Sequence, residues 1–171
     1  MIETRLLTPD DAEAYWKIRL EALETVPRAF GASVETHRNT GPEAMVERLR
    51  PIEEGSFLVG AFAGSELVGT AGMVRAASGK TRHSGFVWGV YVSPLVRGQG
   101  VAFSMFETLL RRVRTYEGLE RLTLDCDADS AGAMALYGKV GFKSYGLEPR
   151  ALKVHDEYVD LHHMLLDLRG P

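Results

Sequence analysis

A short stretch at residues 97–102 (RGQGVA) is the part of the sequence best suited to bind a charged ligand. It follows an apolar segment typical of a strand, at residues 86–92, and it precedes a segment with helical periodicity. Small residues at alternate positions leave backbone N–H groups unobstructed, and the helix N-terminus and the arginine add positive charge. The sequence therefore predicts a site for phosphate or pyrophosphate at this loop.

Two common nucleotide-binding signatures do not fit the chain. A dinucleotide-binding loop, G-x-G-x-x-G, needs glycine where this chain has Phe103, and it opens a strand–helix–strand unit. A triphosphate-binding loop needs G-x-x-x-x-G-K-[ST], but Val74 stands five residues before Gly79, the glycine of the Gly-Lys-Thr sequence. A nucleotide-binding module is therefore the weakest alternative.

The stretch at 97–102 resembles the [RQ]-x-x-G-x-[GA] signature of the GNAT superfamily of acyl-CoA-dependent N-acyltransferases. Residues 91–94 resemble the strand ending before that loop in the family. A second segment, residues 133–142 (AMALYGKVGF), is similar to the family's A-x-x-L-Y-x-x-x-G-F motif. These motifs lie between residues 86 and 142. The order of the expected strands and helices resembles that of the family over nearly the whole chain.

The resemblance implies that the chain uses acetyl-CoA as a cosubstrate. The pyrophosphate would lie on the loop backbone, the pantetheine arm would pair with the preceding strand, and Tyr137 would protonate the departing thiolate. Ser130 stands where asparagine is common in the family, and it offers a shorter side chain with one fewer donor. The cofactor-binding residues implied in this way are Val90, Tyr91, Val92, Arg97, Gly98, Gln99, Gly100, Val101, Ala102 and Ser130.

The acceptor side of the site is less defined. An alkylammonium must lose a proton before it attacks a thioester, so a carboxylate is expected nearby. Many relatives carry an acid on the strand before the glycine loop, but residues 86–92 contain none. Other acids that could accept the proton are Asp125, Asp127 and Glu35. Each of them could instead be a solvated or structural acid. Trp88 is either a wall of the acceptor pocket or a core residue.

Several other reactive side chains have structural interpretations. Tyr137 could be a core residue of an amphipathic helix. Cys126 alternates with leucines on an apolar face, which favours a buried, unreactive thiol over a covalent acyl-enzyme. The adjacent His162 and His163 point to opposite faces of a strand, so they cannot share a metal in the usual way. We predict no metal.

The hydrophobic pattern predicts the elements that must position these residues. Strands are expected at 2–7, 57–63, 67–75, 86–92, 121–126, 142–145 and 158–168, and helices at about 8–26, 41–50, 101–116 and 130–139. Two strand–helix–strand units after residue 86 imply a parallel pair, whereas the earlier hairpin is antiparallel. We expect a mixed α/β fold with a central, mostly antiparallel, twisted sheet flanked by helices. The resemblance implies that the parallel pair splays apart.

The composition narrows the class of protein. A chain of 171 residues without repeats or linkers is the size of one domain, residues 1–171. A net charge of −3 with no long basic block argues against nucleic acid, and there is no apolar run of about 20 residues to span a membrane. The single cysteine and the absence of a signal segment fit a cytoplasmic location. The oligomeric state stays open, with a homodimer as one alternative.

The expected activity is direct transfer of an acetyl group from acetyl-CoA to a primary amine of a small molecule or a peptide. An acyltransferase for longer acyl chains, or for an acceptor that is not an amine, is one alternative. A CoA-binding sensor or interaction module without turnover is another, favoured by the missing strand acid and by Ser130.

Overall fold

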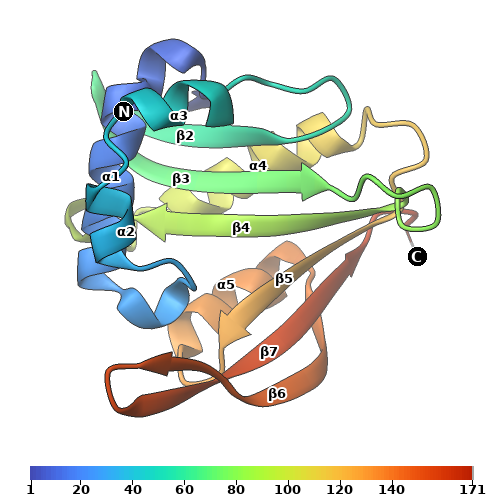
Figure 1. The fold of residues 1–171 in the computed structure, drawn as a ribbon. Helices are drawn as coiled ribbons and strands as arrows, with labels where there is room; N and C mark the ends of the chain where they lie inside the picture. The colour runs from blue at the N-terminus through green and yellow to red at the C-terminus, as the bar shows by residue number, and fades with distance from the viewer. Residues whose placement is uncertain (171) are drawn as a thin grey trace.

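A single mixed sheet runs through the computed structural model, which describes residues 1–170 (Figure 1). Its strands are β1 (Ile2–Leu6), β2 (Phe57–Ala63), β3 (Glu66–Arg75), β4 (Ser84–Val92), β5 (Arg121–Asp127), β6 (Lys143–Val154) and β7 (Glu157–Asp167). They lie in the order β1-β2-β3-β4-β5-β7-β6. Within residues 1–170, β4 and β5 are parallel and every other neighbouring pair is antiparallel. The mixed, mostly antiparallel sheet predicted from the sequence is confirmed.

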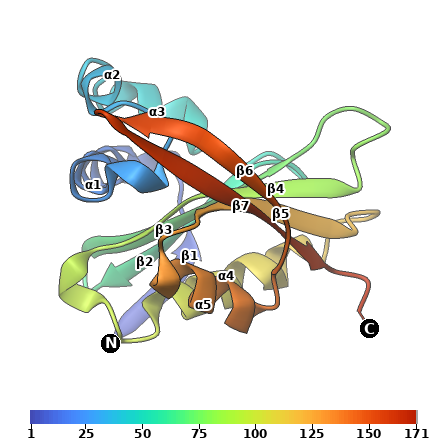
Figure 2. The same cartoon turned by 90° about the horizontal axis from the view of Figure 1, so that it is seen from below.

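Helices cover both faces of the sheet. They are α1 (Ala12–Thr25), α2 (Val34–Arg38), α3 (Glu43–Arg48), α4 (Val101–Val113) and α5 (Ala131–Val140), with 3-10 turns η1 (Pro9–Asp11), η2 (Pro27–Ala29) and η3 (Pro94–Val96). Figure 2 shows α1, α2 and α3 on one side of the sheet and α4 and α5 on the other. Within residues 1–170 no helix is both long and apolar enough to cross a membrane, and no three His, Cys, Asp or Glu side chains converge to hold a metal ion.

Each face of the sheet has its own hydrophobic core. On one face α4 buries Met105, Phe106 and Leu109, which recur at the three- and four-residue spacing of a helix stripe. On the other face α1 buries Tyr15 and Ile18 in the same way. The sheet is packed on both faces, so its central strands hold the loops at their ends in defined positions.

Two elements depart from the sequence-based prediction. Residues 34–38 form the short helix α2, where an irregular segment was expected. Strand β6 was expected to end at residue 145, but it continues to Val154. Strand β6 lies at the edge of the sheet, and Pro149 is tolerated there because it falls in a stretch without regular pairing to β7. Its pairing with β7 is irregular between Glu148 and Leu152, which explains the weak strand pattern.

The parallel strands β4 and β5 pair only at their beginnings. Their register covers three residues, from Ser84 opposite Arg121 to Phe86 opposite Thr123. Beyond that point β4 contains a bulge, since two residues, one of them Gly89 at φ 62°, lie opposite one residue of β3. A bulge bends the strand that carries it. The splayed pair expected from the family resemblance is therefore present.

Candidate active site

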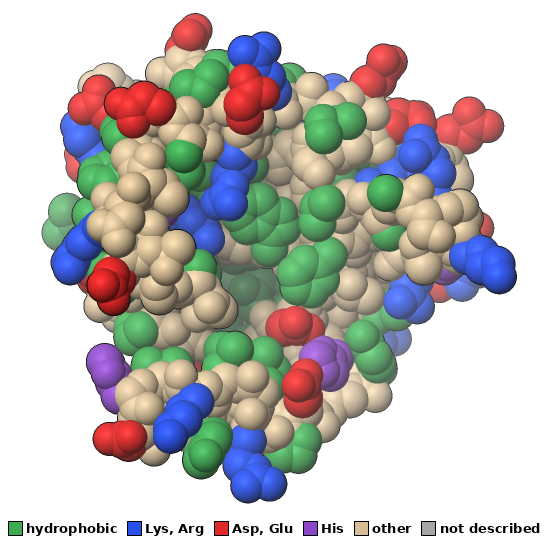
Figure 3. Space-filling model, viewed as in Figure 1, with side chains coloured by type: hydrophobic (Ala, Val, Ile, Leu, Met, Phe, Trp, Pro, Cys, Tyr) green, Lys and Arg blue, Asp and Glu red, His purple; other side chains and the backbone are tan. Residues whose placement is uncertain are grey.

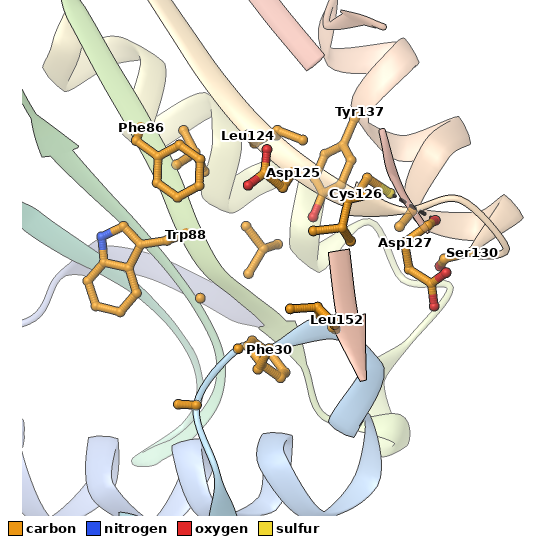
Figure 4. Close-up of a pocket in the computed structure, with 18 of the residues that line it drawn as sticks. Phe30, Phe86, Trp88, Leu124, Asp125, Cys126, Asp127, Ser130, Tyr137 and Leu152 are labelled. Atoms are coloured by element: carbon orange, nitrogen blue, oxygen red, sulfur yellow. Dashed lines mark hydrogen bonds between the residues drawn. The ribbon is translucent and has the colours of Figure 1, made fainter. Parts of the chain in front are cut away.

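Two adjoining cavities occupy the space between β4 and β5. The loop cavity, about 710 Å³, is lined by the end of β4, the glycine loop, the start of α4 and one side of α5. The strand cavity, about 310 Å³, is lined by β4, β5 and the segment after η2, and Figure 4 shows it in close-up. Residues that line both cavities are Ala29, Phe30, Val90, Ser130, Ala133 and Tyr137. A ligand could therefore extend from one cavity into the other.

The glycine loop determines which backbone groups face the loop cavity. Gly98 and Gly100 adopt left-handed backbone conformations, at φ 76° and 78°, that glycine reaches without strain. Gly100 is the N-cap of α4, and no side chain caps the helix. The N–H groups of the first helical turn are therefore left without side-chain partners, at the positive end of the helix dipole. Arg97 braces the loop, because its Nε donates to the carbonyl oxygen of Val92 over 2.9 Å.

Most of the residues predicted to bind the cofactor line the loop cavity. These are Val90, Tyr91, Val92, Arg97, Gly98, Gly100, Val101, Ala102 and Ser130. Gln99 is exposed and lies outside the lining. Ser130 is the N-cap residue of α5, but its hydroxyl makes no capping hydrogen bond. The buried Tyr91 donates its hydroxyl to Glu21 over 2.8 Å, which ties this part of β4 to α1.

Tyr137 lies where the two cavities meet. Its ring packs edge-on against Phe106 and Phe142, with centroids 5.8 and 6.2 Å away. Its hydroxyl is directed into the pocket, toward the strand that carries Asp125 and Cys126 (Figure 4). Burial raises the pKa of this hydroxyl well above its usual range. Tyr137 is therefore a core residue whose hydroxyl stays protonated at neutral pH.

The acidic residues near the cavity have different surroundings. Asp125 lines the strand cavity, and its Oδ1 lies 2.6 Å from Nδ1 of His163, whose Nε2 lies 3.0 Å from Glu148. The hydrogen bond to Asp125 is the main reason that the pKa of His163 is raised. Asp127 accepts from Arg28 over 2.9 and 3.2 Å, and this contact lowers the pKa of Asp127. Asp127 is thus engaged in an ion pair that fastens η2 to β5.

The other two predicted acceptor residues lie in different places. Glu35 is exposed on α2 and is not among the described residues that line either cavity. Trp88 lines the strand cavity and also packs against the core beneath α1. Its indole lies across Gly72, where a Cβ atom would come within 2.6 Å of the ring. Trp88 is therefore partly a core residue and partly a wall of the strand cavity, and its contact with an acceptor stays a prediction.

Several residues of the cavity walls were not predicted from the sequence, among them four with large side chains in the strand cavity. Arg19, Phe30, Leu152 and Leu161 all line the strand cavity. Arg19 follows Tyr15 by one helical turn. A charged residue next to the buried, apolar face of α1 could have indicated that Arg19 faces the site. Leu152 belongs to the part of β6 that the sequence pattern did not reveal.

Cys126 is expected to react slowly with alkylating reagents. Burial, with a smaller contribution from the charge of Asp127, raises the pKa of its thiol to about 11. At pH 8 the thiolate fraction should be about 200-fold below that of an ordinary cysteine with a pKa near 8.5. Iodoacetamide labelling of the native protein should therefore be slow at pH 8 and should accelerate as the pH rises toward 11. Labelling as fast in the native as in the urea-unfolded protein would contradict this prediction.

The profile of the acetyltransferase (GNAT) family matches residues 26–142, and the chain belongs to this family. Its fold is similar to that of an acetyltransferase of the GNAT family from Streptococcus pneumoniae, with a TM-score of 0.83 and 18% identity over 98% of this chain and 99% of that one. It is also similar to a phosphinothricin acetyltransferase from Sinorhizobium meliloti, solved in complex with acetyl-CoA, with a TM-score of 0.82 and 18% identity over 97% and 88% of the chains.

A third similar structure is the ribosomal-protein-alanine N-acetyltransferase from Brucella melitensis. Here the TM-score is 0.78 and the identity 22%, over 96% of this chain and 99% of that one. No curated protein sequence matches the chain significantly. The family and the fold are thus established, whereas the acceptor must be inferred from the residues of the site.

Proposed function

We propose that this protein transfers an acetyl group from acetyl-CoA directly to a primary amine of a small molecule or a peptide. The observation that carries the proposal is the position of Tyr137, which lines both the loop cavity and the strand cavity. One cavity offers free backbone donors for a pyrophosphate, and the other offers a carboxylate for an amine. Family membership and the acetyl-CoA bound by the Sinorhizobium meliloti relative support the choice of cosubstrate.

The loop cavity fits an elongated ligand with an anionic end. The pyrophosphate would accept hydrogen bonds from the backbone of residues 97–102 and would lie at the positive end of α4. The pantetheine arm would run along β4 at Val90 and Val92, whose outer edge has no partner strand beyond Phe86. Acetyl-CoA supplies a thioester, whose carbonyl carbon is open to attack by an amine.

Tyr137 and Asp125 supply the proton transfers. The carboxylate of Asp125 would take a proton from the acceptor ammonium, directly or through water. The free amine would then form the new C–N bond as the thioester C–S bond breaks, and Tyr137 would protonate the leaving sulfur. The nitrogen would lose its second proton to solvent water, and Tyr137 would regain a proton from water. The hydrogen bond from His163 holds Asp125 in the cavity wall and leaves its Oδ2 available.

Thiol release from acetyl-CoA, measured across amines, polyamines, amino acids and peptides, tests the proposal. We expect at least one acceptor to raise the rate above hydrolysis, and the acetylated product to appear in equal amount. Asp125→Asn should reduce this turnover while leaving the thermal stabilisation by CoA intact. Propionyl-CoA and longer thioesters, assayed in the same way, report the acyl-chain preference.

The same measurements identify the alternatives. Stabilisation by CoA without thiol release from any acceptor would favour a CoA-binding sensor or interaction module. Absence of stabilisation by CoA would exclude both the enzyme and the sensor.

A further inference from the structure

Two arginines from different helices lie near Trp88, which lines the strand cavity. Cζ of Arg19 on α1 lies 5.8 Å from the centroid of the Trp88 ring, and Cζ of Arg48 at the end of α3 lies 5.7 Å from it. Arg19 lines the strand cavity together with Asp125 and Tyr137. Its Nη1 lies 3.9 Å from the position that a Cβ on Gly89 would occupy. Arg19 thus places a positive charge in the wall of the proposed reaction site, and Arg48 lies near Trp88 but outside the cavity wall.

Neither guanidinium has a counter-ion within residues 1–170. Other arginines of the chain are paired, such as Arg28 with Asp127 and Arg5 with Asp11. Arg19 and Arg48 form no ion pair with any described residue, and Arg19 is partly buried whereas Arg48 is exposed. A guanidinium has five donors and no acceptor, so a partly buried one is stabilised by an anion. The two charges are therefore available for a ligand.

A buried hydroxyl next to the arginines lacks a partner as well. Tyr15 is 1% exposed, and its hydroxyl makes no hydrogen bond to any described residue. Burial raises the pKa of Tyr15, and the charges of Arg19 and Arg48, together with close contacts of both guanidiniums to the hydroxyl oxygen, oppose this increase. Buried hydroxyl groups in folded proteins are nearly always hydrogen-bonded. An oxyanion between the arginines would give this donor an acceptor.

The opposite wall of the strand cavity carries the opposite charge. Asp125 lies there, with His163 and Glu148 bonded behind it. Figure 3 shows the hollow bordered by basic side chains on one side and by acidic side chains and a histidine on the other, with apolar side chains between them. This arrangement is complementary to a small molecule with separated positive and negative groups.

We infer that the acceptor is a small amine that also carries an oxyanion, as an amino acid or an aminoalkyl phosphonate does. This inference rests on the proposed acetyl transfer and adds the class of substrate. Arg19 and Arg48 bind the oxyanion through their planar donor pairs, which match a carboxylate or a phosphonate. Trp88 supports the carbon chain, and the amine lies toward Asp125 and Tyr137. A cavity of about 310 Å³ suits a molecule of this size.

Matched acceptors test the inference. Each α-amino acid is compared with its carboxamide and with its decarboxylated amine, and 2-aminoethylphosphonate is compared with ethanolamine. We expect kcat/KM for at least one anionic acceptor to exceed that of its neutral partner by about tenfold or more, since a hydrogen bond to a charged group contributes about 1.5–3 kcal/mol. Comparison of the carboxylate pairs with the phosphonate pair shows which oxyanion is preferred.

Substitution of the arginines links the preference to this site. Arg19→Gln and Arg48→Gln should each bring the ratio between anionic and neutral partners toward one. Arg50→Gln is the matched control, because Arg50 lies near the same helix end but pairs with the exposed Glu47. This control should keep the wild-type ratio. Equal or better use of the neutral partners by the wild-type protein would overturn the inference while leaving the proposed acetyl transfer intact.

Binding of products provides a test that does not depend on turnover. In the presence of CoA, N-acetyl amino acids should stabilise the protein against heat more than their carboxamides do, and Arg19→Gln should remove the difference. If no acceptor supports thiol release but this difference is found, the oxyanion site stands and the proposed acetyl transfer fails. Equal stabilisation by both compounds would overturn the oxyanion site.

Discussion

Replacing Tyr137 with phenylalanine is expected to lower kcat for acetyl transfer about 100-fold, the lower end of what a positioned general acid contributes. The ring packs against Phe106 and Phe142, and phenylalanine preserves these contacts. Only the hydroxyl is lost, at the junction of the loop cavity and the strand cavity. Because this group acts on the leaving sulfur, KM for acetyl-CoA should change little. Steady-state thiol release with the best acceptor from the panel measures both parameters.

Tyr116→Phe is a matched control for this experiment. Tyr116 is also a buried tyrosine packed edge-on against an aromatic ring, Phe57, at 6.1 Å, and its hydroxyl has no hydrogen-bond partner among the described residues. It lies outside the lining of both cavities. Tyr116→Phe should keep kcat within about twofold. An equal fall of kcat in the two variants would point to a packing effect, and an unchanged kcat in Tyr137→Phe would exclude the acid role.

The cofactor half of the site could be predicted because it depends on local sequence. A strand, two glycines and a helix start are consecutive in the chain, so residues 97–102 specify the glycine loop, the proposed anion site, without distant contacts. Helix α4 carries a regular buried stripe, and its position next to the loop follows from chain order. The same holds for α5, whose capping residue Ser130 and Tyr137 lie close together in the sequence.

The acceptor half could not be predicted because it depends on tertiary packing. Arg19 and Arg48 belong to different helices, and they meet over Trp88 only after α1 and α3 pack on the sheet. The hydrogen bond between Asp125 and His163 requires β5 to pair with β7, and these residues are far apart in sequence. The bulge at Gly89 depends on pairing with β3 and leaves no hydrophobic pattern of its own. The proposed acceptor site depends on such contacts between residues that are far apart in the sequence. The hydrophobic periodicity of a single sequence does not reveal these contacts.

Replacing Gly100 with valine is expected to raise KM for acetyl-CoA at least about 100-fold and to remove the thermal stabilisation by CoA. Gly100 has φ 78° and lines the loop cavity, and a Cβ there would meet no protein atom within 4 Å. The new side chain would therefore project away from the protein, next to the N–H groups at the start of α4. Loss of two hydrogen bonds to a charged pyrophosphate, at about 1.5–3 kcal/mol each, accounts for this magnitude.

Gly64→Val separates the effect on the ligand from the effect on the backbone. Gly64 has φ 63° in the turn between β2 and β3, and a Cβ there would also meet nothing within 4 Å. Both variants force a β-branched residue into the left-handed region, which costs about 1–2 kcal/mol of unfolding free energy. Urea unfolding should show similar losses of stability in the two proteins, whereas KM for acetyl-CoA should rise only in Gly100→Val. A similar rise in both would mean that backbone strain alone weakens the site, and that the anion does not bind at the start of α4.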